Sequence, residues 1–339
     1  MIVKPTPTKR AVIDPLRKCS AKCRMCYYLH EDLTSIFPLE NMKNDLKKAK
    51  ARGNNYFDVT GGEPFLYSHI IELLNFGHKL GMRSCIITSG LSKESRTKDV
   101  LDTGIDDFLV SVHGTEKVHD FIVQVEGARK KQIRFMEQIR QRMKFRFNCV
   151  ISSMNQHEIL DIAKFMSKWE PTIVNFINFN PHRAWRDKNL AREMVADLKI
   201  VMPQLDEAID HLEEKSIGVN VRYYPMCKLK EDKRKNACND LHVSLDKCEW
   251  DYDIQPKTLE TFRSWGWRLS SGTEHHQYPC NTCDLEWICG GINKYFYNAS
   301  SQKSALSPVK GSGIEDKNDF YHYRKHNYLT LAPNLRPEI

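Results

Sequence analysis

Cys19-Ser-Ala-Lys-Cys23-Arg-Met-Cys26-Tyr27 is a C-x3-C-x2-C run that directly follows Lys9–Asp14, a short stretch rich in β-branched residues. Thiolates at this spacing can bind three corners of a [4Fe–4S] cluster from one loop. Three protein ligands leave one iron with an open coordination position, which suits catalysis, whereas a closed site suits structure or electron transfer. A zinc knuckle is the competing interpretation, and it needs a fourth ligand such as His30.

The residues beyond this run alternate between strand-like and helix-like segments. After Lys9–Asp14, the expected strands are Asn55–Thr60, Arg83–Thr88, Asp107–Val112, Phe145–Ile151 and Ile173–Phe179. The amphipathic segments of helical length between them are Leu39–Ala51, His69–Leu80, Ser92–Thr103, Ala128–Lys144 and Gln156–Trp169. This alternation indicates βα units and a parallel sheet. Six strands are too few for a closed eight-stranded barrel, so the expected fold class is α/β, a partial, open (β/α)6 barrel.

A long helical segment, Leu190–Lys215, ends this alternation. We therefore expect the barrel to occupy residues 1–215 and a small cysteine-rich, cluster-binding domain to occupy residues 216–339. The second part contains six cysteines and few regular periods, so a metal site is expected to support its modest core. Within it, Asn298–Lys317 is rich in Ser, Lys and Gly and is expected to be a mobile surface loop.

The eleven cysteines indicate metal or redox chemistry. The N-terminal sequence shows no apolar core followed by a small-residue cleavage site, and no apolar stretch is long enough to span a bilayer. We therefore expect a cytoplasmic protein with no membrane partner. Disulfides are rare in the reducing cytosol, so clustered cysteines there are more often metal ligands. Cys85 and Cys149 stand apart from the clusters, inside apolar strand patterns, and are expected to be buried packing residues.

The formal net charge of +8 is a mild excess for 339 residues. It would favour an anionic substrate or a nucleic acid, but solvated basic faces are the favoured explanation. In the densest basic run, Arg129–Arg146, aliphatic residues recur at helical spacing, which is typical of an amphipathic outer helix. No nucleic-acid partner is expected.

Thr60-Gly61-Gly62-Glu63-Pro64 stands at the end of the second expected strand. The two glycines let the backbone come close to a ligand, and the proline fixes the chain as it enters the next helix. The cysteine run, with an aromatic residue after its third cysteine, and this segment occur in the same order as in the radical S-adenosylmethionine (SAM) family. The sequence resembles that family, which implies a partial (β/α)6 radical SAM barrel.

The resemblance also implies where the cofactors bind. Cys19, Cys23 and Cys26 would hold the [4Fe–4S] cluster, whose open iron takes the amino and carboxylate groups of SAM. The segment Gly61, Gly62, Glu63 and Pro64 would bind the SAM amino group. The further SAM contacts implied at other strand ends are Thr88, Ser89, Ser111 and Asn148. For each of these four, a satisfied polar residue at the barrel mouth is the alternative.

The C-terminal cysteines resemble the SPASM and twitch extensions of radical SAM enzymes. Their signature is the C-x2-C-x5-C-G-G run at residues 280–291, with Tyr-Pro-Met-Cys227 upstream. The full SPASM pattern needs two more cysteines after this run, so one auxiliary [4Fe–4S] cluster is expected. Its expected ligands are Cys280, Cys283, Cys289 and one of Cys227 or Cys238. A set in which Cys227 and Cys238 join Cys280 and Cys283 is the other arrangement, and a zinc ribbon is the alternative to a cluster.

The resemblance implies that the reduced cluster cleaves SAM to a 5′-deoxyadenosyl radical, which abstracts hydrogen from the substrate. It also implies an external electron donor of flavodoxin or ferredoxin type. The expected substrate is a small molecule, such as a cofactor precursor, or a peptide. Residues that would form a cationic, aromatic pocket for an anionic substrate, or else an exposed polar loop, are His182, Arg183, Trp185, Arg186, Arg222, Tyr223 and Tyr224. The alternative function is a non-catalytic iron–sulfur or zinc protein, which leaves residues 61–64 unexplained.

Overall fold

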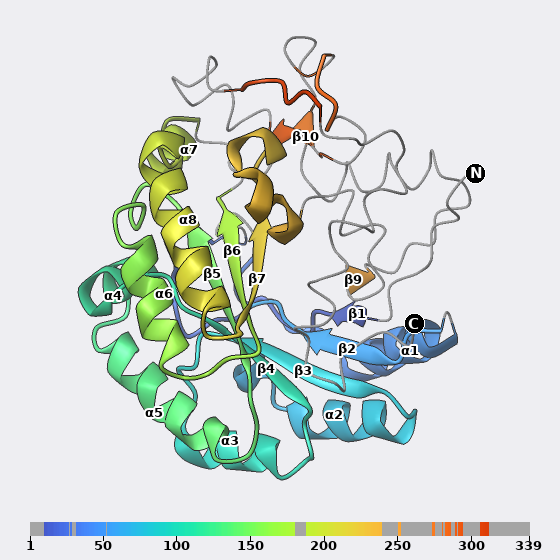
Figure 1. Ribbon diagram of the computed structural model, residues 1–339. Coiled ribbons are helices and arrows are strands. Elements are labelled where there is room, and N and C mark those ends of the chain that lie inside the picture. The colour runs from blue at the N-terminus through green and yellow to red at the C-terminus, as the bar shows by residue number, and fades with distance from the viewer. Residues whose placement is uncertain are drawn as a thin grey trace.

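The centre of the computed structural model is one curled β-sheet (Figure 1). The structure describes residues 10–26, 28, 32–51, 53–179, 188–238, 250–251, 273–274, 280, 282–285, 289, 291–293 and 306–311. The strand order is β8-β7-β6-β5-β4-β3-β2-β1-β9, and every neighbouring pair is parallel. The strands are β1 (Arg10–Ile13), β2 (Tyr56–Val59), β3 (Arg83–Thr88), β4 (Asp107–Ser111), β5 (Arg146–Ile151), β6 (Ile173–Asn178), β7 (Gly218–Arg222), β8 (Ala237–Cys238) and β9 (Trp250–Asp251).

Helices cover the outer face of this sheet (Figure 1). They are α1 (Leu39–Ala51), α2 (Ile70–Lys79), α3 (Glu94–Leu101), α4 (Glu116–Val123), α5 (Ala128–Arg140), α6 (Ile159–Ser167), α7 (Lys188–Met194) and α8 (Leu198–Glu213). From β1 to β7, each crossover returns the chain to the amino end of the sheet, so these successive strands lie side by side and parallel. The expected fold class, a partial, open α/β barrel, is confirmed.

Three elements differ from the sequence expectation. A seventh long strand, β7, pairs with β6, so the sheet extends past residue 215, while the division into two domains there stays a prediction. The helix expected over Leu190–Lys215 is two helices, because the Asp197 side chain accepts the Lys199 N–H at 2.8 Å and caps a new helix, α8. The eight-residue helix α4 was not expected, because it is shorter than the stretch over which helical periodicity is read.

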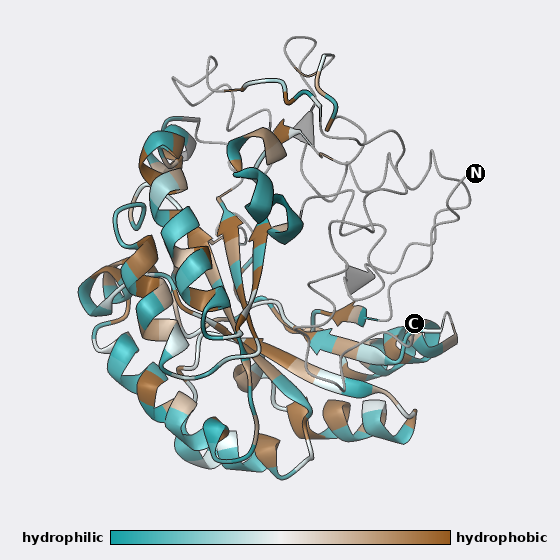
Figure 2. Ribbon diagram, viewed as in Figure 1, coloured by the Kyte–Doolittle hydropathy of each residue, from teal (hydrophilic) through white to brown (hydrophobic). Residues whose placement is uncertain are grey.

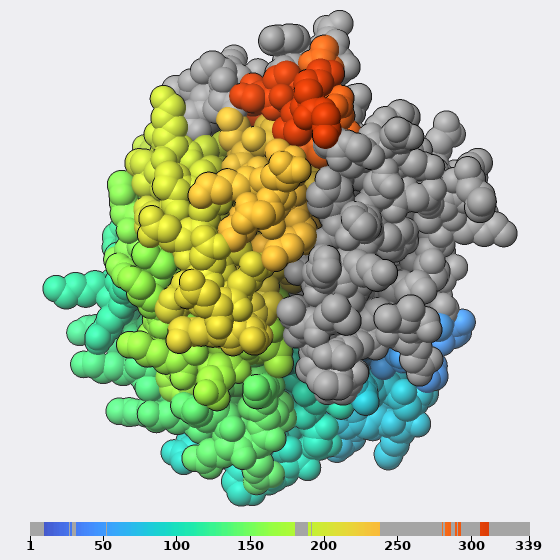
Figure 3. Space-filling model, viewed as in Figure 1, coloured from blue at the N-terminus to red at the C-terminus, as the bar shows by residue number. Residues whose placement is uncertain are grey.

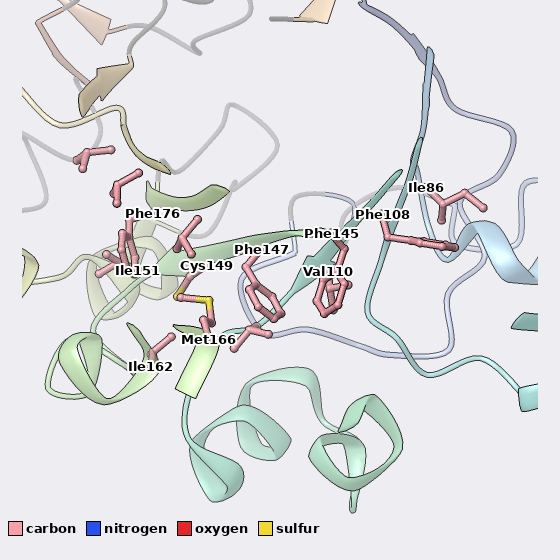
Figure 4. Close-up of a cluster of buried hydrophobic side chains, with 14 of the residues drawn as sticks. Ile86, Phe108, Val110, Phe145, Phe147, Cys149, Ile151, Ile162, Met166 and Phe176 are labelled. Carbon is pink, nitrogen blue, oxygen red and sulfur yellow. The ribbon is translucent and has the colours of Figure 1, made fainter. Parts of the chain in front are cut away.

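Apolar side chains fill the layer between the sheet and the helices. Figure 4 shows Phe108, Phe147, Cys149 and Phe176 together in this core, and all four are fully buried. The central strands are correspondingly hydrophobic in Figure 2, whereas the helices are largely hydrophilic on their outward sides. Cys85 is also fully buried, so the expected burial of both isolated cysteines is confirmed.

The inner face of the sheet carries a buried network of charges. Arg10 donates two hydrogen bonds to Asp58, and Arg146 donates to Asp107 at 2.6 Å. Arg146 also lies 3.8 Å from Asp58, and the Tyr56 hydroxyl donates to Asp107 at 3.3 Å. None of these five residues is more than 9% exposed. The network therefore ties β1 and β2 to β4 and β5 across the inside of the curl.

The described C-terminal residues form small elements. β10 (Thr273–Glu274) and β11 (Ile292–Asn293) make an antiparallel pair, and two short 3-10 helices, η3 (Met226–Lys228) and η4 (Glu231–Asn236), follow β7. Within the part of the chain that the structure describes, no helix has both the length and the apolar character needed to cross a membrane.

Candidate functional site

The cysteine loop, residues 19–26, lies alongside the carboxyl-terminal end of α4. The Lys22 N–H donates to the Val123 carbonyl at 3.1 Å, and the Arg24 N–H donates to the Ile122 carbonyl at 2.9 Å. The Gln124 side chain donates to the Lys22 carbonyl as well. A helix that sequence reasoning missed therefore fixes the backbone of the loop.

The three thiols of this loop are half-buried and close enough to influence one another. Burial raises the pKa of Cys19 to about 11, and the Glu63 carboxylate contributes next. Burial also raises the pKa of Cys23, followed by the charges of Cys26 and Cys19. Three thiolates in this setting repel one another unless a cation lies between them, and the irons of a cluster supply that positive charge. The donor set therefore fits a [4Fe–4S] cluster.

Asp14, at the end of β1, ties both sides of the cysteine loop together. It accepts a hydrogen bond from the Tyr28 hydroxyl at 2.8 Å and forms an ion pair with Arg17. The Arg17 guanidinium stacks over the Tyr28 ring at 4.3 Å. The chain entering the loop and the chain leaving it thus meet at one carboxylate. Tyr27 and His30 lie outside the described residues.

The Gly-Gly-Glu segment is laid directly against the chain that leads into the cysteine loop. The Gly62 N–H donates to the Leu16 carbonyl and the Glu63 N–H to the Lys18 carbonyl, both at 2.8 Å. A Cβ at Gly62 would lie 2.0 Å from the Lys18 carbonyl oxygen, and one at Gly61 would lie 2.1 Å from Asp14 Oδ1. The two glycines are therefore needed because the backbone leading into the cysteine loop packs directly against them.

Glu63 lies in a cradle of hydrogen-bond donors and is only 2% exposed. Thr88 Oγ1 donates to Oε1 at 2.7 Å, while Oε2 accepts from the Ser89 N–H at 3.0 Å and from Ser89 Oγ at 2.6 Å. Burial raises the pKa of Glu63, and these hydrogen bonds oppose that rise. Thr88 and Ser89, two residues predicted to contact SAM, thus hold the carboxylate of a third. A fixed carboxylate beside the cysteine loop fits the ammonium group of SAM.

Gln132 on α5 is a site residue that sequence reasoning missed. Its side chain is fully buried, and Nε2 donates to the carbonyls of Ser89 and Ser111, both at 2.8 Å. Its Oε1 accepts from the buried Arg129. Gln132 therefore fixes the ends of β3 and β4 relative to each other, and no motif in the basic amphipathic run distinguishes it from the other glutamines there.

A row of polar side chains crosses the inner face of the sheet. Ser111 and Asn148 are register partners, and the row continues through Asn175 to Asn220. Asn220 Nδ2 donates to Asn175 Oδ1 at 2.9 Å. Register partners share a face, so the structure brings the predicted Ser111 and Asn148 together. Asn175 and Asn220 were missed, although each interrupts an otherwise apolar strand.

The C-terminal cysteines converge on one cavity. The residues lining it include Cys227, Cys280, Cys283 and Cys289. Backbone N–H groups donate to their sulfurs: Val309 to Cys283 at 3.3 Å, and Gly291 to Cys289 at 3.4 Å. Hydrogen bonds of this kind are typical around iron–sulfur clusters. Burial raises the pKa of Cys289 to about 12, so cationic ligation would be needed to keep it ionised.

Two further observations bear on this cavity. The Cys238 side chain and all of Cys248 lie outside the described residues. In the part of the chain that the structure describes, no group of three or more His, Cys, Asp or Glu side chains is arranged to hold a single metal ion.

The segment 306–311 forms one side of this cavity. It falls within the stretch expected to be a mobile loop, yet Leu306 and Val309 pack against the core. The Asp284 N–H donates to the Val309 carbonyl at 2.9 Å, and Asp284 Oδ2 accepts the Gly311 N–H at 2.7 Å. Figure 3 shows the segment, in red, seated beside the gold surface that follows β7. Composition suggested mobility because its few apolar residues are scattered among small ones.

The expected cationic, aromatic pocket is described only in part. His182, Arg183, Trp185 and Arg186 lie outside the described residues. Arg222 ends β7 in register with Ile177, two residues beyond Asn220 and therefore on the same inner face. Tyr224 is buried.

Sequence comparison relates this arrangement to known proteins. The Radical SAM superfamily profile matches residues 13–166. A GTP 3',8-cyclase of Helicobacter pylori (strain HPAG1) is 26% identical over 205 residues, which cover 55% of this chain and 63% of the relative. The S-adenosylmethionine-dependent nucleotide dehydratase RSAD2 of Siniperca chuatsi is 28% identical over 160 residues, 42% of this chain and 43% of the relative. The chain thus spans less than two thirds of the length of these relatives.

Solved structures share the fold. Native anSMEcpe with bound AdoMet has a TM-score of 0.58 at 15% identity, covering 96% of this chain and 98% of that chain. Streptococcus suis SuiB bound to the precursor peptide SuiA has a TM-score of 0.53 at 18% identity, covering 64% of this chain and 48% of that chain. At these identities the likeness shows the fold alone. Residues 13–166, which contain the cysteine run and the Gly-Gly-Glu-Pro segment, thus match the Radical SAM superfamily.

Proposed function

We propose that this chain is an enzyme that cleaves SAM reductively at a [4Fe–4S] cluster held by Cys19, Cys23 and Cys26. The family match implies this cluster and SAM as cofactors. When bound, they supply a 5′-deoxyadenosyl radical that abstracts hydrogen from the substrate. The observation that carries the proposal is the backbone bond from the Glu63 N–H to the Lys18 carbonyl, because it joins the buried carboxylate to the residue next to Cys19.

The chain's own residues bind and orient the reactants. The Glu63 carboxylate, held by Thr88 and Ser89, accepts a hydrogen bond from the ammonium group of SAM. Ser111 and Asn148 face the same interior and contact the nucleoside part. Fixing these groups before SAM arrives lowers the cost of reaching the reactive geometry, and the barrel interior limits the access of water.

We further propose one auxiliary [4Fe–4S] cluster, bound by Cys227, Cys280, Cys283 and Cys289. The support is that all four line one cavity and that backbone N–H groups donate to the sulfurs of Cys283 and Cys289. Among the two ligand sets that the sequence left open, this geometry favours the one that includes Cys289. These four cysteines would hold the cluster, which would supply a site for substrate binding or an acceptor for an electron from a product radical.

Iron content tests the auxiliary cluster. Anaerobic reconstitution should give roughly eight irons per chain, and roughly four in a Cys280→Ala/Cys283→Ala variant, on the four-iron stoichiometry of such clusters. The variant should keep the absorbance of the SAM-binding cluster. Stoichiometric zinc with only about four irons in the unmodified protein would instead favour the zinc ribbon.

The Glu63 cradle gives a second test. In Ser89→Ala the carboxylate loses a 2.6 Å hydrogen bond, so its pKa rises further and its orientation is less fixed. We expect SAM affinity, measured by anaerobic calorimetry on the reconstituted protein, to fall about tenfold, or ~1.4 kcal/mol. Ser92→Ala is the control, since that hydroxyl bonds to Thr97 outside the cradle. Equal SAM affinities in Ser89→Ala and Ser92→Ala would show that the Glu63 cradle does not bind SAM.

We propose a small anionic substrate, of which a nucleotide is the leading example. Two of the sequence relatives are named as a GTP 3',8-cyclase and a nucleotide dehydratase. The inner face also offers carboxamides, from Asn148 to Asn220, and the Arg222 cation near the mouth. Carboxamides can pair with a base, and guanidinium with phosphate. A peptide is the alternative substrate.

The deciding experiment is anaerobic incubation of the reconstituted protein with SAM and dithionite. It should yield 5′-deoxyadenosine, and a nucleotide panel should raise the yield above the substrate-free level. Absence of 5′-deoxyadenosine would favour a non-catalytic iron–sulfur protein. Stimulation by a peptide alone would overturn the nucleotide assignment.

A further inference from the structure

We infer that the solvent side of the cysteine loop is the docking surface for an acidic one-electron carrier protein of the flavodoxin or ferredoxin type. The inference rests on the proposed cluster at the loop and names the place where its electron arrives. We call this the donor surface. Its residues are Lys18, Lys22, Arg24, Lys117 and Phe121.

The cysteine loop presents opposite chemistry on its two sides. Ala21 and Met25 are buried, and the three cysteines are half-buried. Lys18, Lys22 and Arg24, which alternate with them along the chain, are exposed. The loop is therefore a thin cover with the sulfurs on its protein side and three cations on its solvent side.

Helix α4 extends this positive surface and adds an apolar contact. The Arg24 guanidinium stacks over the Phe121 ring at 4.1 Å and donates to the Phe121 carbonyl at 3.1 Å. Phe121 is 53% exposed, and Lys117, one turn earlier on the same face, is exposed as well. An exposed aromatic ring beside arginine is typical of protein–protein contact sites.

Three nearby carboxylates offset part of this charge. Glu116 lies 3.9 Å from Lys130. The Asp120 carboxylate accepts the N–H groups of Gly127 and Arg129, both at 2.8 Å, which commits it to the turn between α4 and α5. Glu126 is exposed and is the remaining carboxylate in this stretch. The surface as a whole stays positive.

These features together fit an electron carrier. Electron transfer slows steeply with distance, so a carrier must dock where little protein separates it from the cluster. One electron leaves the reduced carrier and is gained by the oxidised cluster, and no atom moves between them. A positive surface steers an acidic carrier into position and favours fast, weak, salt-sensitive docking. An anionic substrate would be recognised on the opposite side of the loop, where Glu63 and the row from Ser111 to Asn220 lie.

The test compares charge reversal on the donor surface with charge reversal elsewhere. The test variant is Lys22→Glu/Lys117→Glu, and a second variant, Phe121→Ser, removes the apolar contact. The control is Lys168→Glu/Lys215→Glu. Both control lysines are exposed and lie just before β6 and β7, at the amino end of the sheet, whereas the cysteine loop follows the carboxyl end of β1. Binding of the reconstituted proteins to oxidised flavodoxin and to ferredoxin is measured at low and high salt.

We expect the test variant to bind both carriers at least about tenfold more weakly than the unmodified protein at low salt, with the difference shrinking as salt screens the charges. The control should bind within about twofold, and Phe121→Ser should bind more weakly than the control. Formation of 5′-deoxyadenosine driven by reduced flavodoxin should fall in the test variant, while the dithionite-driven rate should not.

The outcomes separate this inference from the proposed function. Equal carrier affinity in the test and control variants overturns the donor surface, whatever the activity. Loss of the dithionite-driven rate in the test variant alone also overturns it, since the loop itself would then be damaged. If dithionite produces no 5′-deoxyadenosine even with the unmodified protein, the proposed function fails, while the binding measurement still decides whether acidic carriers use this surface.

Discussion

Replacing Cys19, Cys23 and Cys26 together by alanine abolishes the formation of 5′-deoxyadenosine from SAM and removes about four of roughly eight irons per chain. Since these thiols are proposed to supply all the protein ligands of the SAM-binding cluster, no partial activity is expected. The iron that remains should belong to the cavity lined by Cys227, Cys280, Cys283 and Cys289. Product analysis by chromatography and iron determination on the same sample check both parts.

The control for this variant is Cys149→Ala. Cys149 is a fully buried core residue on β5, so its loss should cost stability but no iron. A triple variant that still produces 5′-deoxyadenosine would show that the cysteine loop is not the SAM-cleaving centre. If the unmodified protein contains only about four irons, the proposal of an auxiliary cluster is wrong.

Introducing a side chain at Gly62 should have the next largest effect. A Cβ there would lie 2.0 Å from the Lys18 carbonyl oxygen and 2.6 Å from that of Arg17, and both neighbours are backbone atoms that cannot rotate away. Gly62→Val must therefore push the cysteine loop off the Gly-Gly-Glu segment. We expect loss of SAM binding by calorimetry together with loss of the four irons of the first cluster, on the stoichiometry of such clusters.

Gly53→Ala controls for the general cost of replacing a glycine. Gly53 has a φ of +97° but no atom near the added Cβ, so its replacement costs only backbone strain, about 1–2 kcal/mol. A Gly62→Val protein with full iron and weakened SAM binding would mean that the loop adapts and that the glycine serves the ligand alone. Full iron with unchanged SAM affinity would remove the segment from the site.

The barrel could be predicted because each βα unit is specified locally. Strands such as Arg83–Thr88 and helices such as Ile70–Lys79 carry their own periodic pattern, and alternation then dictates a parallel sheet. Helix α4 could not be predicted in this way, because it spans only eight residues and its carboxyl end is bonded to the cysteine loop, which is distant in sequence. The division into α7 and α8 at Asp197 follows from a capping hydrogen bond that the sequence pattern does not reveal.

The residues of the candidate site likewise fall into two groups, those that a sequence motif identifies and those that only tertiary contacts identify. Motifs identify residues whose chemistry is unusual at fixed spacing, such as the cysteines and Glu63. They do not reveal contacts between segments distant in sequence. Thr88 and Ser89 were predicted to contact SAM, but their bonds to Glu63 span some 25 residues of chain. Gln132, more than 40 residues beyond Ser89, has no motif at all, and its role follows only from where α5 packs.

The ion network of Arg10, Asp58, Asp107 and Arg146 has a mechanical consequence for the mouth of the barrel. It joins strands on both sides of the bend, so its contact lengths set how tightly the sheet curves. That curvature in turn sets the clearance between the cysteine loop, after β1, and the amide row on β5 to β7. The network thus connects the strands that carry the two halves of the site. We therefore expect substitutions in this network, which lies apart from every proposed ligand, to change that clearance.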